Sequence, residues 1–176
     1  MVAADLGLLV LRLAVGLTFA AHGAQKAFGW WNGPGWLGWQ NAIGRMGFRP
    51  VELFAVLSVG AELIGGLLLA LGLATPLAAA VLVAQSTVIV LKAHAPKGFW
   101  NRDGGLEYPL VLGLAALAVG LTGAGALSLD AVASTSTTDS VRIVLMIAGI
   151  AAGLLAAALP SATASSDRPG PAAPSR

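Results

Sequence analysis

Long apolar segments alternate with short polar ones along the chain. Five of them stand out, at about residues 6–28, 51–73, 76–92, 106–122 and 141–159. A hydrocarbon core about 30 Å thick needs about 20 helical residues, and about 17 to 25 are acceptable. The pattern therefore predicts an all-α membrane protein with five transmembrane helices, of which the first is a retained span and not a cleaved signal peptide.

The connections between these segments carry their own signals. In the stretch 72–76, Gly72 suits a helix C-terminus, Thr75 an N-cap and Pro76 the first helical position, which predicts a tight helical hairpin. Pro50 is expected to open the second span in the same way. The connection 29–49 holds four tryptophans among glycines, and we expect it to lie along the lipid headgroups. The polar, Ser/Thr-rich stretch 128–140 is predicted to be an exposed loop, and the tail 160–176 to be disordered.

Composition supports the membrane assignment, since 57% of the residues are hydrophobic and only 10% charged. The net charge of +2 comes without a basic patch, so we expect no nucleic-acid partner. Most Lys and Arg fall in the connections 29–49 and 93–105 and in the tail. The positive-inside bias then places the N-terminus outside the cell membrane and the C-terminus in the cytoplasm.

The chain has no cysteine. It therefore cannot carry a disulfide, a thiolate nucleophile or a Cys-ligated iron–sulfur cluster by itself. With no recognisable haem or flavin motif either, any electron-transfer role requires a partner that supplies electrons.

Several polar side chains fall inside or close to the predicted spans, where a charge is costly and usually functional. The intramembrane polar candidates are Arg12, His22, Lys26, Glu62, Gln85, His94 and Glu107. Depth estimates at about 1.5 Å per residue predict an Arg12–Glu62 pair. Glu62 shares a helical face with Gly65 and Gly66, and that face should point into the bundle because small residues allow close helix approach.

A second polar layer is predicted near the cytoplasmic surface. Its members come from three spans and are His22, Lys26, Lys92, His94 and Glu107. One interpretation is a proton relay, or a set of hydrogen-bond donors for a quinone-like headgroup. The alternative is that the lysines and Glu107 reach the headgroups and pair there. A metal site of His22, His94 and Glu107 has no supporting helical spacing, so we expect no metal.

Short motifs in a fixed order resemble the DoxX family of small bacterial membrane proteins. They run from residue 8 to Asp130 and include Leu11-Arg-Leu13, His22-Gly-Ala-Gln-Lys26, Glu62-Leu-Ile-Gly-Gly66, Gly72-Leu-Ala-Thr-Pro76, Gly105-Leu-Glu-Tyr-Pro109 and Ser128-Leu-Asp130, with Gly35, His94, Gly98 and Phe99 between them. The resemblance implies a four-helix membrane domain over 1–130, a polar loop over 131–140 and an additional helix over 141–159. It also implies a link to redox and oxidative-stress physiology, because the family takes its name from a subunit of an archaeal thiosulfate:quinone oxidoreductase.

Three functions remain open from the sequence. The first is a redox-associated membrane subunit that binds a quinone and works with partner oxidoreductases. The second is a non-catalytic scaffold that holds soluble redox or stress enzymes at the cytoplasmic face. The third is a small-solute carrier whose path is lined by the intramembrane charges. Self-association into a homo-oligomer is compatible with all three.

Overall fold

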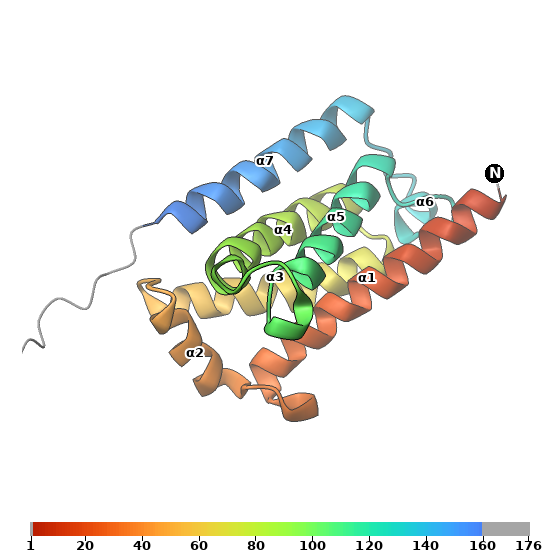
Figure 1. Ribbon diagram of the computed structural model, residues 1–176. Coiled ribbons are helices and arrows are strands. Elements are labelled where there is room, and N and C mark those ends of the chain that lie inside the picture. The colour runs from red at the N-terminus through yellow and green to blue at the C-terminus, as the bar shows by residue number, and fades with distance from the viewer. Residues whose placement is uncertain (1, 160–176) are drawn as a thin grey trace, which may run out of the picture.

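The computed structural model describes residues 2–159, and helices joined by short loops are the regular secondary structure of this part of the chain. The five long helices are α1 (Val2–Phe28), α3 (Val51–Leu71), α4 (Thr75–Val88), α5 (Glu107–Thr122) and α7 (Asp139–Ala158). Two short ones, α2 (Gly35–Arg45) and α6 (Leu129–Val132), lie at opposite ends of the bundle (Figure 1). The five predicted apolar helices and the all-α membrane architecture are confirmed. The predicted tail, 160–176, lies outside the described residues.

Four of the described helices are long and apolar enough to cross a membrane, counting the π and 3-10 turns that extend α4 to Lys97. The fifth, α5, has 16 residues and spans about 24 Å, less than a 30 Å hydrocarbon core. A helix of this length brings the loop before it close to the hydrocarbon if α5 spans the bilayer, and backbone groups there need partners. They find them within the loop, where Leu106 N donates to Gly98 O at 3.0 Å and Glu107 N to Phe99 O at 2.9 Å.

Helices α1 and α3 make the most extensive helix–helix contact of the bundle, and small residues bring their backbones close together. A Cβ atom on Gly16 would lie 2.5 Å from the Gly66 carbonyl oxygen, and one on Gly23 would lie 2.6 Å from the Leu63 nitrogen. Lipid tails are as apolar as the helices, so such close van der Waals packing is what holds membrane helices together. The two glycine contacts also fix the register between the antiparallel helices.

The C-terminal helix α7 is an integral part of the bundle, lying along α4 and α5 (Figure 1). A Cβ on Gly149 would come within 2.5 Å of the Ala80 carbonyl, and one on Gly153 within 2.7 Å of the Ala84 carbonyl. These two glycines are four residues apart and form a GxxxG face, a pattern that brings two membrane helices into backbone contact.

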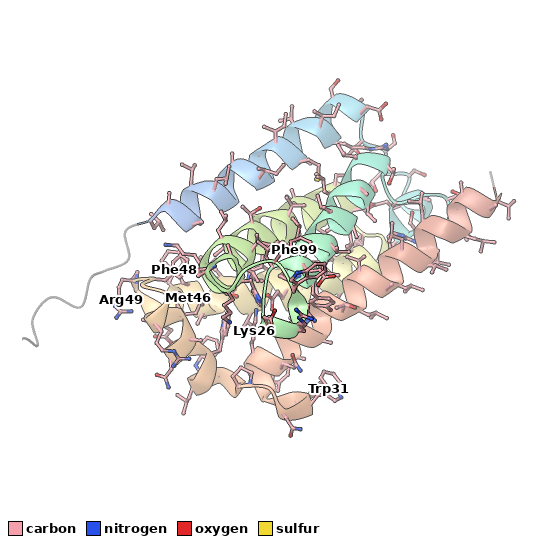
Figure 2. The ribbon with its side chains drawn as sticks, in the orientation of Figure 1. Lys26, Trp31, Met46, Phe48, Arg49 and Phe99 are labelled. Atoms are coloured by element: carbon pink, nitrogen blue, oxygen red, sulfur yellow. The ribbon has the colours of Figure 1, made fainter. Side chains whose placement is uncertain are left out.

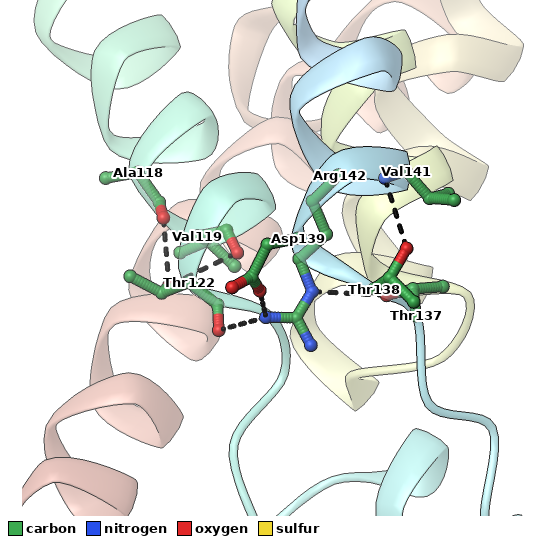
Figure 3. Close-up of polar contacts among 8 residues, drawn as sticks. All are labelled: Ala118, Val119, Thr122, Thr137, Thr138, Asp139, Val141 and Arg142. Carbon is green, nitrogen blue, oxygen red and sulfur yellow. Dashed lines mark hydrogen bonds and ion pairs between the residues drawn. The ribbon is translucent and has the colours of Figure 1, made fainter.

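Arg142 fastens the first turn of α7 to the end of α5 (Figure 3). Its guanidinium donates to the Thr122 carbonyl at 3.1 Å and to the Thr137 hydroxyl at 3.2 Å, and it pairs with Asp139 at 3.3 Å. A cation stabilises a helix C-terminus, where backbone carbonyls lack intrahelical partners. Arg142 thereby gives a carbonyl at the end of α5 a hydrogen-bond partner, and it holds the start of α7 in place.

The turn between α3 and α4 forms as predicted at Gly72, whose φ of 66° is the left-handed conformation favoured at helix C-termini. The prediction of Thr75 as the N-cap is wrong, because the helix already begins at Thr75 and its cap position is Ala74. Pro50 is likewise the residue before its helix and not the first helical one.

The capping group of α4 comes from a distant part of the chain. The Asp130 carboxylate accepts hydrogen bonds from Ala74 N at 2.8 Å and from Thr75 N at 2.9 Å. Partial burial acts to raise the pKa of Asp130, but these bonds and one from Thr135 outweigh it, so the pKa lies below its usual value. The stretch before residue 140 is therefore not a plain exposed loop, because it contains α6 and this cap.

The tryptophan-rich connection contains a helix that the sequence analysis did not predict. In α2, Trp36 and Trp39 pack with Ile43 and Phe48 against the start of α3, whereas Leu37 on the opposite face is exposed. An amphipathic helix with this distribution is suited to the plane of the membrane interface. That location stays a prediction.

Candidate functional site

A cavity of about 500 Å³ lies between the helices, toward the end of the bundle where α2 is found. Its walls come from all five long helices and from α2, and most of its lining is apolar, for example Phe19, Leu57, Leu112 and Ala156. Its polar and charged lining residues are His22, Lys26, Ser58, Glu62, Gln85, Ser86, His94 and Tyr108. Figure 2 shows Lys26 inside the bundle, whereas Trp31 projects from its edge. A mostly apolar cavity with a few convergent polar groups is typical of a small-molecule site.

The centre of the polar lining is an ion pair between Lys26 on α1 and Glu62 on α3. Glu62 is only 1% exposed, and its face with Gly65 and Gly66 points into the bundle as predicted. Gln85 on α4 donates to the same carboxylate oxygen at 3.2 Å and to the Ser58 hydroxyl at 2.7 Å. The other carboxylate oxygen, Oε2, is buried and has no hydrogen-bond partner among the described residues.

Lys26 also contacts the aromatic wall of the cavity. Its Nζ lies 4.1 Å from the centroid of a Trp39 ring, within the range of a cation–π interaction. The indole nitrogen of Trp39 is buried and, like Glu62 Oε2, finds no partner within residues 2–159. The ammonium group therefore stands between two side chains that each retain one unused hydrogen-bonding atom.

His22 lies one turn before Lys26 on α1 and is half-buried. Its Nδ1 is 3.2 Å from Gln25 Oε1, and its Nε2 is 3.5 Å from the Tyr108 hydroxyl. An amide oxygen only accepts, so Nδ1 carries the hydrogen of a neutral ring and Nε2 is the acceptor that faces the phenol. Tyr108 was missed in the sequence, where a lone tyrosine at a helix start has no periodic or spacing signal.

His94 reaches the cavity from the end of a π-helical segment, Ile89–His94, that continues α4. Single π turns within α-helices are frequent at functional sites, since they redirect side chains. His94 Nδ1 lies 2.7 Å from the Gly104 carbonyl oxygen and 3.1 Å from that of Gly105. The ring thus supports the loop before α5 and keeps Nε2 as its acceptor nitrogen when neutral.

The predicted Arg12–Glu62 pair is wrong, because the register of α1 against α3 separates the two residues. Gly23 packs on Leu63, beside Glu62, whereas Arg12 lies eleven residues earlier, about 16 Å along the helix. Arg12 is fully buried next to Gly72 and donates to the Leu127 carbonyl. Glu62 pairs instead with Lys26, which had been predicted for the surface layer.

The predicted cytoplasmic layer is thus divided between different places. His22, Lys26 and His94 line the cavity, whereas Lys92 and Glu107 do not. Glu107 accepts the Asn101 backbone N–H at 3.0 Å, and Lys92 lies 3.4 Å from the Leu159 carbonyl. His22, His94 and Glu107 each have a different partner, and no group of three potential metal ligands occurs among the described residues.

Comparison with known proteins agrees with this architecture. The DoxX family model matches residues 7–95, which include most of α1, all of α3 and α4, and most of the polar lining of the cavity. A Haemophilus influenzae protein, itself uncharacterized, is 30% identical over 131 residues, which cover 73% of this chain and 84% of that protein. No solved structure matches the chain. The chain belongs to the DoxX family.

Proposed function

We propose that this DoxX-family membrane protein binds the ring of a quinone-like molecule in its intramembrane cavity and works with a partner oxidoreductase in the cell membrane. The observation that carries the proposal is the buried Lys26–Glu62–Gln85 cluster on the wall of a mostly apolar cavity. Ionisable groups are expensive in a membrane interior, and a pocket of about 300–1,000 Å³ is the size that holds small organic ligands.

The lining suits an amphipathic ring with an apolar tail. The ring oxygens find donors in the Lys26 ammonium, which carries three hydrogens, and in the indole nitrogen of Trp39, which has no partner among the described residues. The surrounding apolar side chains replace the lipid around the ring. A prenyl tail is compatible with the bilayer outside the helices. A strongly polar solute would leave most of the apolar lining without favourable contact, which makes the carrier hypothesis the weaker one.

Reduction of a quinone consumes two electrons and two protons. His22 and Tyr108 lie within hydrogen-bond distance of each other at the cavity wall, and both side chains are types that act as proton donors and acceptors in catalysis. The electrons are assigned to a partner protein, whose identity the proposal leaves open. The proposed orientation keeps the N-terminus outside and places the Lys26 end of the bundle at the cytoplasmic side, where soluble reductants are found.

A cavity-filling variant tests this proposal. Ala61 lines the cavity on α3, so Ala61→Phe should place a ring in the ligand volume. Ala151→Phe, on the exposed face of α7, is the matched control for an added ring in a lipid-facing position. Binding of 1,4-naphthoquinone to the purified protein in nanodiscs should be saturable, lost in Ala61→Phe and kept in Ala151→Phe. Equal binding by both variants would contradict a site in this cavity.

The scaffold hypothesis rests on a different surface, at the α2 end of the bundle. Trp30, Trp31, Phe99 and Trp100 are each at least half exposed there. Phe99 and Trp100 lie close in sequence to Lys97 and Arg102. Aromatic and basic side chains are enriched in protein interfaces and at lipid headgroups alike. If the scaffold role is real, charge reversal at Lys97 and Arg102 should release soluble oxidoreductases that otherwise copurify, while ligand binding in the cavity is unchanged.

A further inference from the structure

Two buried polar atoms at the cavity have no hydrogen-bond partner among the described residues, and one is an acceptor whereas the other is a donor. Five buried side-chain atoms lack a partner within residues 2–159, and three of them belong to Arg12 and Thr75 at the other end of the bundle. The remaining two are Glu62 Oε2 and Trp39 Nε1, both on residues that line the cavity. Native proteins leave few such atoms unsatisfied, so a pair at one site calls for an explanation.

Each atom can be satisfied by only one kind of group. The carboxylate of Glu62 is ion-paired with Lys26, so its free oxygen accepts a hydrogen bond and donates none. The indole nitrogen of Trp39 only donates. The Lys26 ammonium is bonded to Glu62 Oε1 and lies 4.1 Å from the Trp39 ring centroid, so both atoms flank the same group.

Ring hydroxyls and ring carbonyls differ in what they offer to these two atoms. A hydroxyl oxygen donates its hydrogen and also accepts, and it can serve both Glu62 Oε2 and Trp39 Nε1. A carbonyl oxygen only accepts, so it serves Trp39 and leaves the carboxylate oxygen desolvated without a donor. A site that is built to bond a hydroxyl discriminates strongly against the analogue that lacks it, because its own buried group is then left unpaired.

We propose that the cavity selects the reduced, hydroxyl-bearing form of its ring ligand, with Glu62 Oε2 accepting the hydroxyl hydrogen and Trp39 Nε1 donating to the ring oxygen. This inference rests on the proposed function, since it specifies which redox form of the quinone-like ligand is held. Tighter binding of the quinol raises the reduction potential of the bound couple by about 30 mV for each tenfold preference. The site therefore favours acceptance of two electrons from the partner reductant and two protons, and it retains the quinol product.

The first test compares two redox-inert probes of equal ring size. 2-Naphthol presents a hydroxyl, whereas 2-methoxynaphthalene presents an oxygen that only accepts. Isothermal titration of the full chain in nanodiscs, with empty nanodiscs subtracted, should give at least about tenfold tighter saturable binding of 2-naphthol, the discrimination expected for a hydroxyl-specific site. The reduced and oxidised forms of 1,4-naphthoquinone, compared without oxygen, should rank in the same order. The lack of cysteine removes thiol addition to the quinone as a competing reaction.

Two variants identify the atoms responsible. Glu62→Gln can present an amide donor in place of the acceptor, so the preference for 2-naphthol should fall to less than about threefold, with Glu52→Gln, exposed on the same helix, as the control. Trp39→Phe keeps a ring for Lys26 but removes the indole donor, and it should weaken both probes, whereas Trp36→Phe should weaken neither. Trp36 is on the same helix outside the cavity lining.

The outcomes separate this inference from the proposed function. Equal binding of the two naphthalenes, or tighter binding of the ether, overturns the hydroxyl preference while the ring-binding cavity stands. Binding of neither naphthalene and neither naphthoquinone form contradicts the proposed function itself. The comparison of probes on the unaltered protein decides the matter even where Glu62→Gln fails to fold.

Discussion

Lys26 and Glu62 differ in their distance from water, so removing one of them should cost more stability than removing the other. Glu62 is 1% exposed in the middle of α3, whereas Lys26 is 12% exposed and two residues from the end of α1. Lys26→Met leaves the carboxylate buried with Gln85 as its remaining partner, at a cost of about 3–5 kcal/mol for breaking a buried pair. Glu62→Leu leaves a lysine that can extend to the headgroups, so the loss is about 2 kcal/mol, the worth of one charge-assisted hydrogen bond.

The double variant Lys26→Met, Glu62→Leu replaces the pair by apolar side chains of similar volume. Such replacements are close to neutral in stability, within about 1 kcal/mol. The single variants sum to about 5–7 kcal/mol, so the coupling free energy should be about 4–8 kcal/mol. Reversible unfolding by SDS in mixed micelles, followed by near-UV circular dichroism, measures the unfolding free energy of the unaltered protein, the two single variants and the double variant.

Two results would refute this reasoning. Additive single variants would mean that the pair contributes no coupling, and a smaller cost for Lys26→Met than for Glu62→Leu would mean that burial does not set the asymmetry. The double variant also separates packing from function. It should be stable but lose naphthoquinone binding; a double variant that binds like the unaltered protein would make the pair a packing element alone.

Three further predictions concern the rest of the bundle. Because hydrogen bonds hold the pKa of Asp130 below its usual value of about 3.9, its cap stabilises the fold at neutral pH and is lost as pH falls below about 4; Asp130→Asn should remove this acid-dependent part of the unfolding free energy. Gly149→Leu should push α7 off α4, lowering the melting temperature by several degrees. Single cysteines at Gln40 and Ser136 should label from the cytoplasm and from outside, respectively.

Each of these has an internal control. Asp103→Asn, an exposed carboxylate without a cap, should leave the pH dependence unchanged. Gly7→Leu meets no atom within 4 Å and should leave the melting temperature unchanged; a drop equal to that of Gly149→Leu would discount the α4–α7 contact. Labelling of Gln40 and Ser136 from the same side would rule out the proposed topology.

The sequence by itself determined the five long helices and the inward face of Glu62. Both follow from local information, because about 20 consecutive apolar residues suffice to define a span, and positions three and four apart share a helix face. The α2 helix could not be predicted in this way. Its three glycines lower helix propensity, and it is held by packing of Trp36 and Trp39 on neighbouring residues, a contribution that no local pattern reports.

Tertiary structure alone decided the partners of the polar residues. Glycine contacts at Gly16 and Gly23 set the register of α1 on α3. In that register Lys26, and not the predicted Arg12, lies beside Glu62. Asp130 reaches its cap on Thr75 across 55 residues of chain, a separation at which sequence spacing carries no signal. The apolar pattern thus determines which segments enter the membrane, because transfer into lipid depends on each segment alone. Which charges meet depends on the axial offset between helices, and that offset is set by the shapes of both surfaces in contact.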